Sequence, residues 1–192
     1  MANKGKRFPP EILNQEEIQR FISSFPKTKT GKRNLALITV YLRSQLRCNE
    51  ALNLRPCDID WKQCAITVLR GKGGKRRVVG IDKGALEVVK KWDNVRPESE
   101  YFFCTHGGGQ MDTSYVRRLV KRHARTSGIE KRVHPHGFRH TGACELADEG
   151  IDIRIISKQL GHTTLAVTDR YLDHLSPGAV ISAIRDRQPI TH

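Results

Sequence analysis

Two short β-branched runs interrupt a sequence whose other apolar residues are spaced for helices. The runs are Cys64–Leu69 and Arg77–Ile81, and Gly71-Lys-Gly-Gly-Lys75 separates them. β-Branched residues favour strands, and a short glycine-rich segment between two such runs predicts a β-hairpin. The hairpin lies in the first half of the chain, so the fold must accommodate a small antiparallel sheet among helices.

Helical patterns surround the predicted hairpin. Asn14-Gln-Glu-Glu17 has the spacing of a capping box and predicts a helix to about Phe25. After a basic, turn-rich connector over Lys27–Arg33, the apolar series from Leu35 to Leu42 predicts a largely buried helix. Further helices are expected at Asn49–Leu54, at Lys83–Trp92, from Asp112 or Thr113 to about Arg125, and from Pro135 onward with breaks at Gly150, Gly161 and Pro177. The sequence therefore predicts a mainly α (α+β) domain with a small antiparallel β-hairpin or sheet in its first half.

The composition indicates a polyanionic partner. The 192 residues carry 34 Lys and Arg against 20 Asp and Glu, a formal net charge of +14, so double-stranded DNA is the expected partner. Five cysteines, an odd number without a Cys-x-x-Cys pair, favour a reducing compartment over a disulfide framework. No apolar stretch approaches the length of a membrane span, and the polar start is unlike a signal peptide. We therefore expect a cytoplasmic protein with no membrane partner.

The last third carries reactive side chains at close spacing. His136-Gly-Phe-Arg139-His140 is followed by Leu160-Gly161-His162 and, nine residues after that histidine, by Tyr171. Attack of a tyrosine hydroxyl on a phosphodiester is one of the few reactions that needs this set. A phenol has a pKa of about 10, so a base or nearby cations must draw off its proton. The same cations stabilise the negative charge that develops on the phosphate.

Together with two earlier segments, this pattern resembles the catalytic domain of tyrosine recombinases, the phage integrase family, from about Asn14 to about Leu175. The earlier segments are Leu46-Arg47-Cys-Asn-Glu50 and Gly71-Lys72-Gly. Any one of the five boxes is a weak signal, whereas five in the right order are specific. The resemblance implies the family's catalytic-domain fold. It also implies a site-specific DNA recombinase or integrase, typical of mobile elements, that cleaves and rejoins strands through a covalent 3′-phosphotyrosyl intermediate.

The resemblance implies a role for each matched residue. Tyr171 would attack the scissile phosphate and become linked to the 3′ end of the DNA. Arg47 and Arg139 would hold the non-bridging oxygens, for which planar guanidinium groups offer bidentate donors. His162 would add a third donor, and His136 would assist proton transfer.

Lys72 in the hairpin turn would protonate the leaving 5′ hydroxyl, and Lys75 in the same turn is the alternative for this role. Glu50 and His140 would support the site. His140 lies one helical turn after the first histidine of its box, a spacing that metal sites use. However, Gly137 stands where His-Glu-x-x-His metalloproteases have glutamate, and the arginines supply the charge that a metal would bring. We therefore expect no metal and no cofactor.

Basic side chains outside the five boxes are expected to contact DNA. These are Lys75, Arg76 and Arg77 beside the turn, and Arg117, Arg118 and Lys121 on a predicted helix. Each basic run taken alone is compatible with an ordinary solvated surface. Taken together, the runs are too unbalanced in charge for that reading.

Two features depart from the family pattern. Most members have a glycine directly before Leu-Arg, where this chain has Gln45, which puts the local turn geometry in question. The chain is also expected to divide into a basic flexible segment at 1–12, a catalytic domain at 13–175 and a helical tail at 176–192. The N-terminal core-binding domain usual in the family would then be absent, which is consistent with a fragment or with a minimal enzyme.

Two alternatives share the same fold. One is a non-catalytic DNA-binding protein, and the other is an enzyme with activity like that of type IB topoisomerases. Because recombination joins two cut sites, a homo-oligomer, typically a tetramer, is expected on DNA, with a monomer in free solution as an alternative. The helical tail would dock either on its own domain or on a neighbouring copy.

Overall fold

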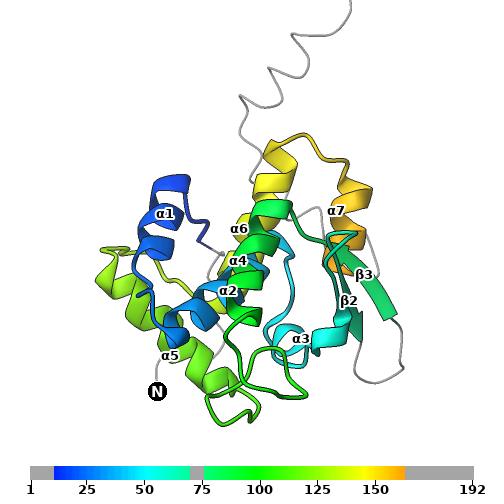
Figure 1. Ribbon diagram of the computed structural model, residues 1–192. Helices are drawn as coiled ribbons and strands as arrows, with labels where there is room; N and C mark the ends of the chain where they lie inside the picture. The colour runs from blue at the N-terminus through cyan, green and yellow to red at the C-terminus, as the bar shows by residue number, and fades with distance from the viewer. Residues whose placement is uncertain (1–10, 70–75, 163–192) are drawn as a thin grey trace, which may run out of the picture.

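The structure, a computed structural model, describes residues 11–69 and 76–162. Its elements follow in the order α1 (Gln15–Ser23), α2 (Lys29–Arg43), α3 (Cys48–Leu52), η1 (Pro56–Asp58), β1 (Ile59–Asp60), β2 (Ala65–Leu69), β3 (Arg76–Gly80), α4 (Lys83–Asp93), α5 (Thr113–Thr126), α6 (Pro135–Asp148) and α7 (Ile153–Leu160). In Figure 1, α2, α4 and α6 occupy the centre, with α1 and α5 on one side and the sheet with α7 on the other. The prediction of a mainly helical fold with a small antiparallel sheet is confirmed.

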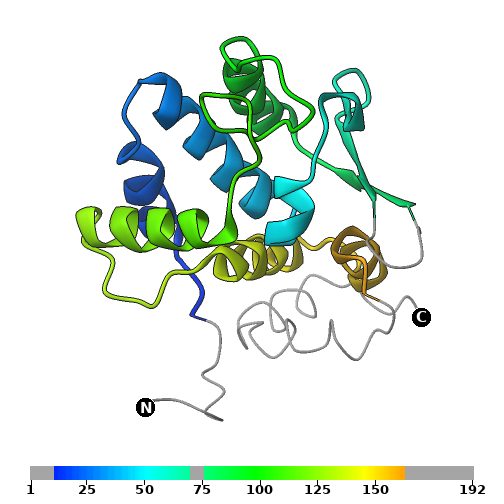
Figure 2. The same cartoon turned by 90° about the horizontal axis from the view of Figure 1, so that it is seen from below.

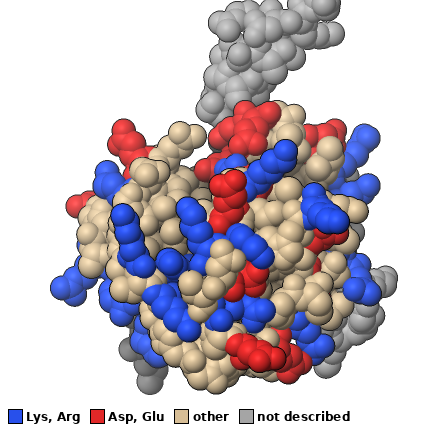
Figure 3. Space-filling view, viewed as in Figure 1, with Lys and Arg blue, Asp and Glu red and all other residues tan. Residues whose placement is uncertain are grey.

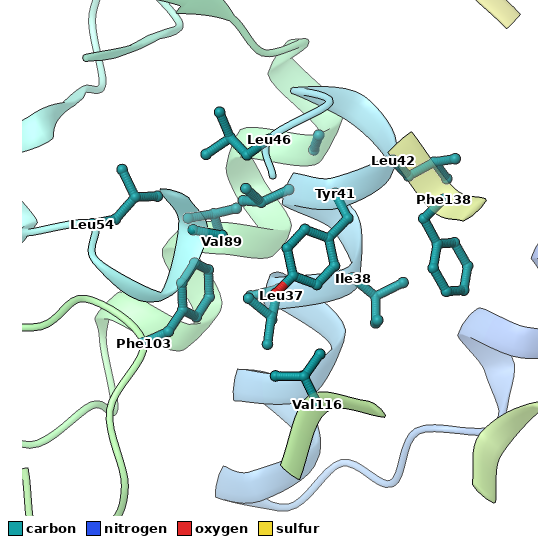
Figure 4. Close-up of a cluster of buried hydrophobic side chains, with 14 of the residues drawn as sticks. Leu37, Ile38, Tyr41, Leu42, Leu46, Leu54, Val89, Phe103, Val116 and Phe138 are labelled. Atoms are coloured by element: carbon teal, nitrogen blue, oxygen red, sulfur yellow. The ribbon is translucent and has the colours of Figure 1, made fainter. Parts of the chain in front are cut away.

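The helix around which the others pack is α2. It contacts both α4 and α6, and its residues from Ala36 to Leu42 are all buried. Figure 4 shows α2 side chains among those of several other segments; the labelled residues are Leu37, Ile38, Tyr41, Leu42, Leu46, Leu54, Val89, Phe103, Val116 and Phe138. A helix that is apolar on all sides is typical of a protein core. Even so, among the described residues no helix has both the length and the apolarity that a membrane span requires.

The start of α2 corrects one prediction. A turn-rich connector over Lys27–Arg33 is wrong, because the helix begins at Lys29, with the Thr28 side chain capping its first turn. Arg33 is buried, and its guanidinium donates to the main-chain carbonyl of Cys104 at 3.1 Å. A run of charged residues predicts a surface loop only if no buried group accepts their hydrogen bonds. The acceptor of Arg33, the Cys104 carbonyl, is distant in sequence, so the prediction could not take it into account.

The capping box at the start of α1 is confirmed. The Asn14 side chain accepts from the main-chain N–H of Glu17, and the Glu17 carboxylate accepts from the N–H of Asn14, both at 2.8 Å. These bonds satisfy two donors that a helix start leaves without intrahelical acceptors. Glu17 also accepts from Lys131 at 2.7 Å, which ties the first helix to the segment before α6.

The sheet has three antiparallel strands in the order β1-β2-β3. β2 and β3 pair from Ala65 with Gly80 to Leu69 with Arg76, so the predicted hairpin is confirmed. β1 pairs with the other edge of β2, which makes a second, smaller hairpin that the sequence analysis did not predict. A strand of two residues is too short to show an alternating pattern.

The helices α6 and α7 form the last third of the described chain. Gly150 and Gly161, which follow them, have φ angles of 79° and 63°, a left-handed conformation that glycine adopts without strain, so both predicted breaks are confirmed. The predicted break at Pro177 and the helical tail lie outside the described residues. Figure 2 shows α5, α6 and α7 following one another along one side of the molecule.

Gly142 is the point of closest approach between α6 and α2. A Cβ atom added there would lie 1.8 Å from the Leu42 carbonyl oxygen and 2.8 Å from Nε2 of Gln45. Neither partner is free to move, because one is helix backbone and the other is a buried side chain. The absence of a side chain at Gly142 therefore sets the distance between these helices.

Replacing Gly142 with alanine should lower the free energy of unfolding by about 1–3 kcal/mol, because α6 must move away from α2. Urea denaturation measures the change. Gly84→Ala on α4 is the control, since a Cβ there meets only Oδ1 of Asp82, at 3.4 Å. That variant should stay within about 1 kcal/mol of the unchanged protein. Equal midpoints for Gly142→Ala and the unchanged protein would contradict this account of helix spacing.

Candidate active site

Four of the residues that the sequence analysis places in the active site lie at ends of helices. Arg47 caps the start of α3, His136 and Arg139 lie in the first turns of α6, and His162 follows the glycine that ends α7. The positive charge of Arg139 and that of Arg47 both act on the two imidazoles. The fold thus brings together residues that are more than a hundred positions apart in sequence.

Arg139 is the central group of the site and is only 1% exposed. Its Nη1 donates to the main-chain carbonyl of Gln45, and its Nη2 donates to that of Leu160 at 2.6 Å. The same Nη2 lies 3.4 Å from Nε2 of His162. Carbonyl groups carry only partial charge, so these two bonds orient the guanidinium without neutralising it.

A single carboxylate joins two further arginines. Glu50 accepts from the Arg47 side chain at 2.9 Å and from both terminal nitrogens of Arg77, at 2.7 and 2.8 Å. Burial alone would raise the pKa of Glu50, but the hydrogen bonds from Arg77 and from the Arg47 main chain lower it to about 2. Glu50 is therefore ionised at neutral pH and fixes both side chains.

The structure places Arg77 inside this cluster, although the sequence analysis assigned it to DNA contact with Arg76. Its side chain is 11% exposed and paired with Glu50, whereas Arg76 is exposed. The strand pattern contained the signal for this, because alternate residues of a strand face the same side and Arg77 alternates with the buried Val79. Arg77 also lies against Gly161, where an added Cβ would be 2.7 Å from its Nε.

Both histidines of the candidate site are neutral at pH 7. Desolvation and the charges of Arg139 and Arg47 lower the pKa of His162 to about 4. Desolvation, Arg139 and His134 lower the pKa of His136 in the same way. An arginine can only donate, so Nε2 of His162 acts as the acceptor toward Arg139 and the ring proton resides on Nδ1.

The other histidines of this region have structural contacts. His134 caps α6 by accepting from the Gly137 N–H at 3.0 Å, and its ring stacks parallel to that of His136 at 6.4 Å between centroids. His140 is buried, 3% exposed, one turn further along α6. Among the residues that the structure describes, no group of three or more His, Cys, Asp or Glu has the arrangement of a metal site.

Sequence reasoning missed Gln159 and left the geometry of Gln45 open. Gln45 has a φ of 50°, the left-handed region in which a glycine is favoured, and its side chain donates to the Leu42 carbonyl at 2.6 Å. Gln159 donates to the Gln45 side chain at 3.1 Å. The presence of glutamine instead of glycine at position 45 indicated that its side chain makes a contact. The sequence does not show that the partner is Gln159, because the two residues are far apart along the chain.

Basic side chains continue from the site along α5. Arg117, Arg118 and Lys121 are exposed on this helix, and in Figure 3 Lys and Arg gather over the part of the face where α5 lies. A cavity of about 700 Å³ separates α5 from residues 128–135. Its basic lining residues are Arg117, Lys121, Arg125, Lys131, Arg132 and His134. The predicted residues Lys72, Lys75 and Tyr171 lie outside the described residues.

Comparisons with known proteins agree on one family. The model described as the phage integrase family matches residues 11–176. The chain is 36% identical over 172 residues to the tyrosine recombinase XerA of Thermococcus kodakarensis, covering 88% of this chain and 60% of that protein. It is 30% identical over 180 residues to the tyrosine recombinase XerC of Syntrophus aciditrophicus, covering 88% and 58%. The chain therefore spans about three fifths of the length of these relatives.

Solved structures show the same fold. The crystal structure of XerA recombinase superimposes with a TM-score of 0.82 at 28% identity, covering 97% of this chain and 68% of that one. The XerH site-specific recombinase bound to its palindromic difH substrate superimposes with a TM-score of 0.77 at 27% identity, covering 93% and 54%. The fold of the described residues is thus that of a tyrosine recombinase catalytic domain, as predicted.

Acidification should destabilise the protein in part through His162. An unfolded histidine has a pKa of about 6.5 and the folded one about 4, so the unfolded state binds the extra proton as pH falls through this window. Stability is therefore present above pH 6.5 and is lost progressively toward pH 4. Urea midpoints at pH 7 and pH 5 should differ less for His162→Asn than for the unchanged protein. Identical losses in both proteins would contradict the lowered pKa.

Proposed function

Because the chain belongs to the phage integrase family, we propose that it cleaves and rejoins DNA at specific sites through a covalent 3′-phosphotyrosyl intermediate. The observation that carries this proposal is the cluster of two arginines and two neutral histidines, Arg47, Arg139, His136 and His162. A phosphodiester carries one negative charge, and more charge develops on its oxygens during substitution. Fixed guanidinium donors stabilise that charge without reorganising during the reaction.

Arg139 and Arg47 would bind the non-bridging oxygens, with His162 as a further donor. The bonds of Arg139 to two main-chain carbonyls leave its net charge available to the phosphate. Tyr171 would attack phosphorus and displace the 5′ oxygen, which Lys72 would protonate as it leaves. His136, neutral at pH 7, would take up or relay the proton of the phenol. The bond energy is kept in the phosphotyrosine ester, so a DNA hydroxyl can reseal the strand without ATP.

Glu50, Arg77 and His140 would support this arrangement rather than react. Glu50 forms an ion pair with Arg47 and so offsets the repulsion of Arg47 by the neighbouring cations. The Glu50 carboxylate also forms an ion pair with Arg77. Breaking a buried ion pair by removing one partner leaves an uncompensated charge, which is strongly unfavourable. His140 is buried on α6 next to Arg139 and would support the site through packing.

We assign double-stranded DNA as the partner and the exposed α5 residues Arg117, Arg118 and Lys121, with Lys75 and Arg76, as phosphate contacts. The solved structures that this fold matches include the XerH site-specific recombinase bound to its palindromic difH substrate, which supports this assignment. Several copies, a tetramer in the simplest case, would assemble on DNA because strand exchange joins two cut sites. A cytoplasmic location fits both the partner and the five cysteines, which are all free thiols.

Residues 13–175 would form the catalytic domain, flanked by a basic segment at 1–12 and a helical tail at 176–192. The family match over residues 11–176 supports these limits. The alternatives of a non-catalytic DNA-binding protein and a type IB topoisomerase predict, respectively, binding without an adduct and relaxation of supercoiled DNA without recombination. The matched relatives, which are recombinases, favour the main proposal.

A nicked suicide substrate, which traps the covalent intermediate, tests the proposal directly. The unchanged protein should form a protein–DNA adduct, and Tyr171→Phe should form none, because it lacks the attacking oxygen. Arg47→Ala should slow adduct formation by about 10²–10³-fold, the usual cost of one transition-state donor. Its duplex affinity, measured by fluorescence anisotropy, should change little. Adduct formation by Tyr171→Phe at the unchanged rate would refute the assignment of the nucleophile.

A substrate with sulfur at the bridging 5′ position shows whether Lys72 or Lys75 is the general acid. A thiolate leaves without protonation, whereas an alkoxide needs a general acid. Lys72→Ala should therefore cleave the normal substrate slowly and the sulfur substrate at nearly the rate of the unchanged protein. Lys75→Ala is the matched control and should show no such selective rescue. Selective rescue of Lys75→Ala instead would transfer the general-acid role to that residue.

A further inference from the structure

Gln45, which is buried, and Gln159, which is half-buried, lie between three separate elements. Gln45 ends the turn after α2, Gln159 lies in the last turn of α7, and both contact the end of β3 directly or through each other. They are 114 positions apart in sequence. Neither carries a charge or a reactive group, so the proposed chemistry does not use them directly.

Gln45 occupies a strained backbone position. Its φ is 50°, and a non-glycine residue in the left-handed region costs about 1–2 kcal/mol. The side chain of Gln45 offsets that cost with two hydrogen bonds in the protein interior. Its Nε2 donates to the Leu42 carbonyl at 2.6 Å, and its Oε1 accepts from Nε2 of Gln159 at 3.1 Å.

Gln159 in turn pairs with both main-chain groups of Gly80 at the end of β3. Its Oε1 accepts from the Gly80 N–H at 2.9 Å, and its Nε2 donates to the Gly80 carbonyl at 2.8 Å. This contact imitates the pairing of an additional strand. Because a main-chain donor and a main-chain acceptor fix the amide, the orientation of Gln159 is determined, and that of Gln45 follows from it.

The segments that contain Gln45 and Gln159 also carry the two main-chain carbonyls that accept hydrogen bonds from Arg139. One acceptor is the carbonyl of Gln45 itself, and the other is the carbonyl of Leu160, the residue next to Gln159. We infer that Gln45 and Gln159 form a positioning pair that sets the separation of these two carbonyls and thereby the place of the Arg139 guanidinium and of His162. The inference rests on the proposed function for its catalytic consequence, but its structural part does not.

Gln159→Glu is the sharpest variant, because it keeps the size and shape of the side chain and removes the donor. The new carboxylate oxygen would face the Gly80 carbonyl and Oε1 of Gln45, so the pair must separate. Single-turnover cleavage of the suicide substrate should fall by about 10- to 100-fold, since small displacements of a phosphate-binding group are costly. Duplex affinity should remain within about threefold because the exposed basic residues are unchanged.

Three further variants guard against a simple folding defect. Gln45→Gly removes the side chain and relieves the backbone strain, so the protein should stay folded while cleavage slows. Combining Gln45→Gly with Gln159→Glu should cause little additional loss, since both break the same contact. Gln63→Glu, an exposed glutamine in the turn before β2, is the matched control and should leave cleavage unchanged.

A second measurement needs no DNA. Desolvation and the charge of Arg139 both lower the pKa of His162, so NMR titration should show this pKa rising in Gln45→Gly, a variant that adds no charge of its own, and staying the same in Gln63→Glu. Folded Gln159→Glu and Gln45→Gly proteins with unchanged cleavage rates and an unchanged His162 pKa would overturn the inference. An unchanged protein that forms no adduct would refute the proposed function alone, and the titration would still decide whether the pair positions Arg139.

Discussion

The guanidinium of Arg139 is a full positive charge inside the protein, and much of the fold serves to make that position tolerable. Removing a charged group from water is expensive unless polar groups replace the lost hydration. Here the replacements include two main-chain carbonyls, at Gln45 and Leu160, which come from turns at the ends of different helices. Both turns must therefore be formed before Arg139 can be buried, so the site and the tertiary structure are interdependent.

Glycines at two positions make that geometry accessible. Gly142 lets α6 approach α2 until the first turn of α6 reaches the Gln45 carbonyl, and Gly161 ends α7 in a left-handed conformation. The left-handed residue also leaves room for Arg77, which lies against it. A side chain at Gly142 would meet the Leu42 carbonyl and Gln45, and one at Gly161 would meet Arg77, so both glycines set the geometry of the candidate site as well as the packing.

The sequence predicted those features that depend on neighbours along the chain. The capping box at Asn14, the β2–β3 hairpin and the buried course of α2 all follow local patterns of polarity. It did not predict that α2 begins at Lys29, because the acceptor that buries Arg33 is 71 residues away. Gln159 was missed for the same reason, since Gly80 is 79 positions distant. The five boxes identified the family, whereas the hydrogen bonds that orient their side chains required the structure.

The hairpin is joined to the candidate active site at two points on β3, Arg77 next to the turn and Gly80 at the base. Arg77 binds Glu50, which also holds Arg47, and Gly80 binds Gln159 beside the Leu160 carbonyl that holds Arg139. Residues 70–75 connect β2 with β3, and β3 is hydrogen-bonded to the segments that hold Arg47 and Arg139. A general acid in the turn between β2 and β3 would therefore be positioned by the same hydrogen-bonded segments that position Arg47 and Arg139.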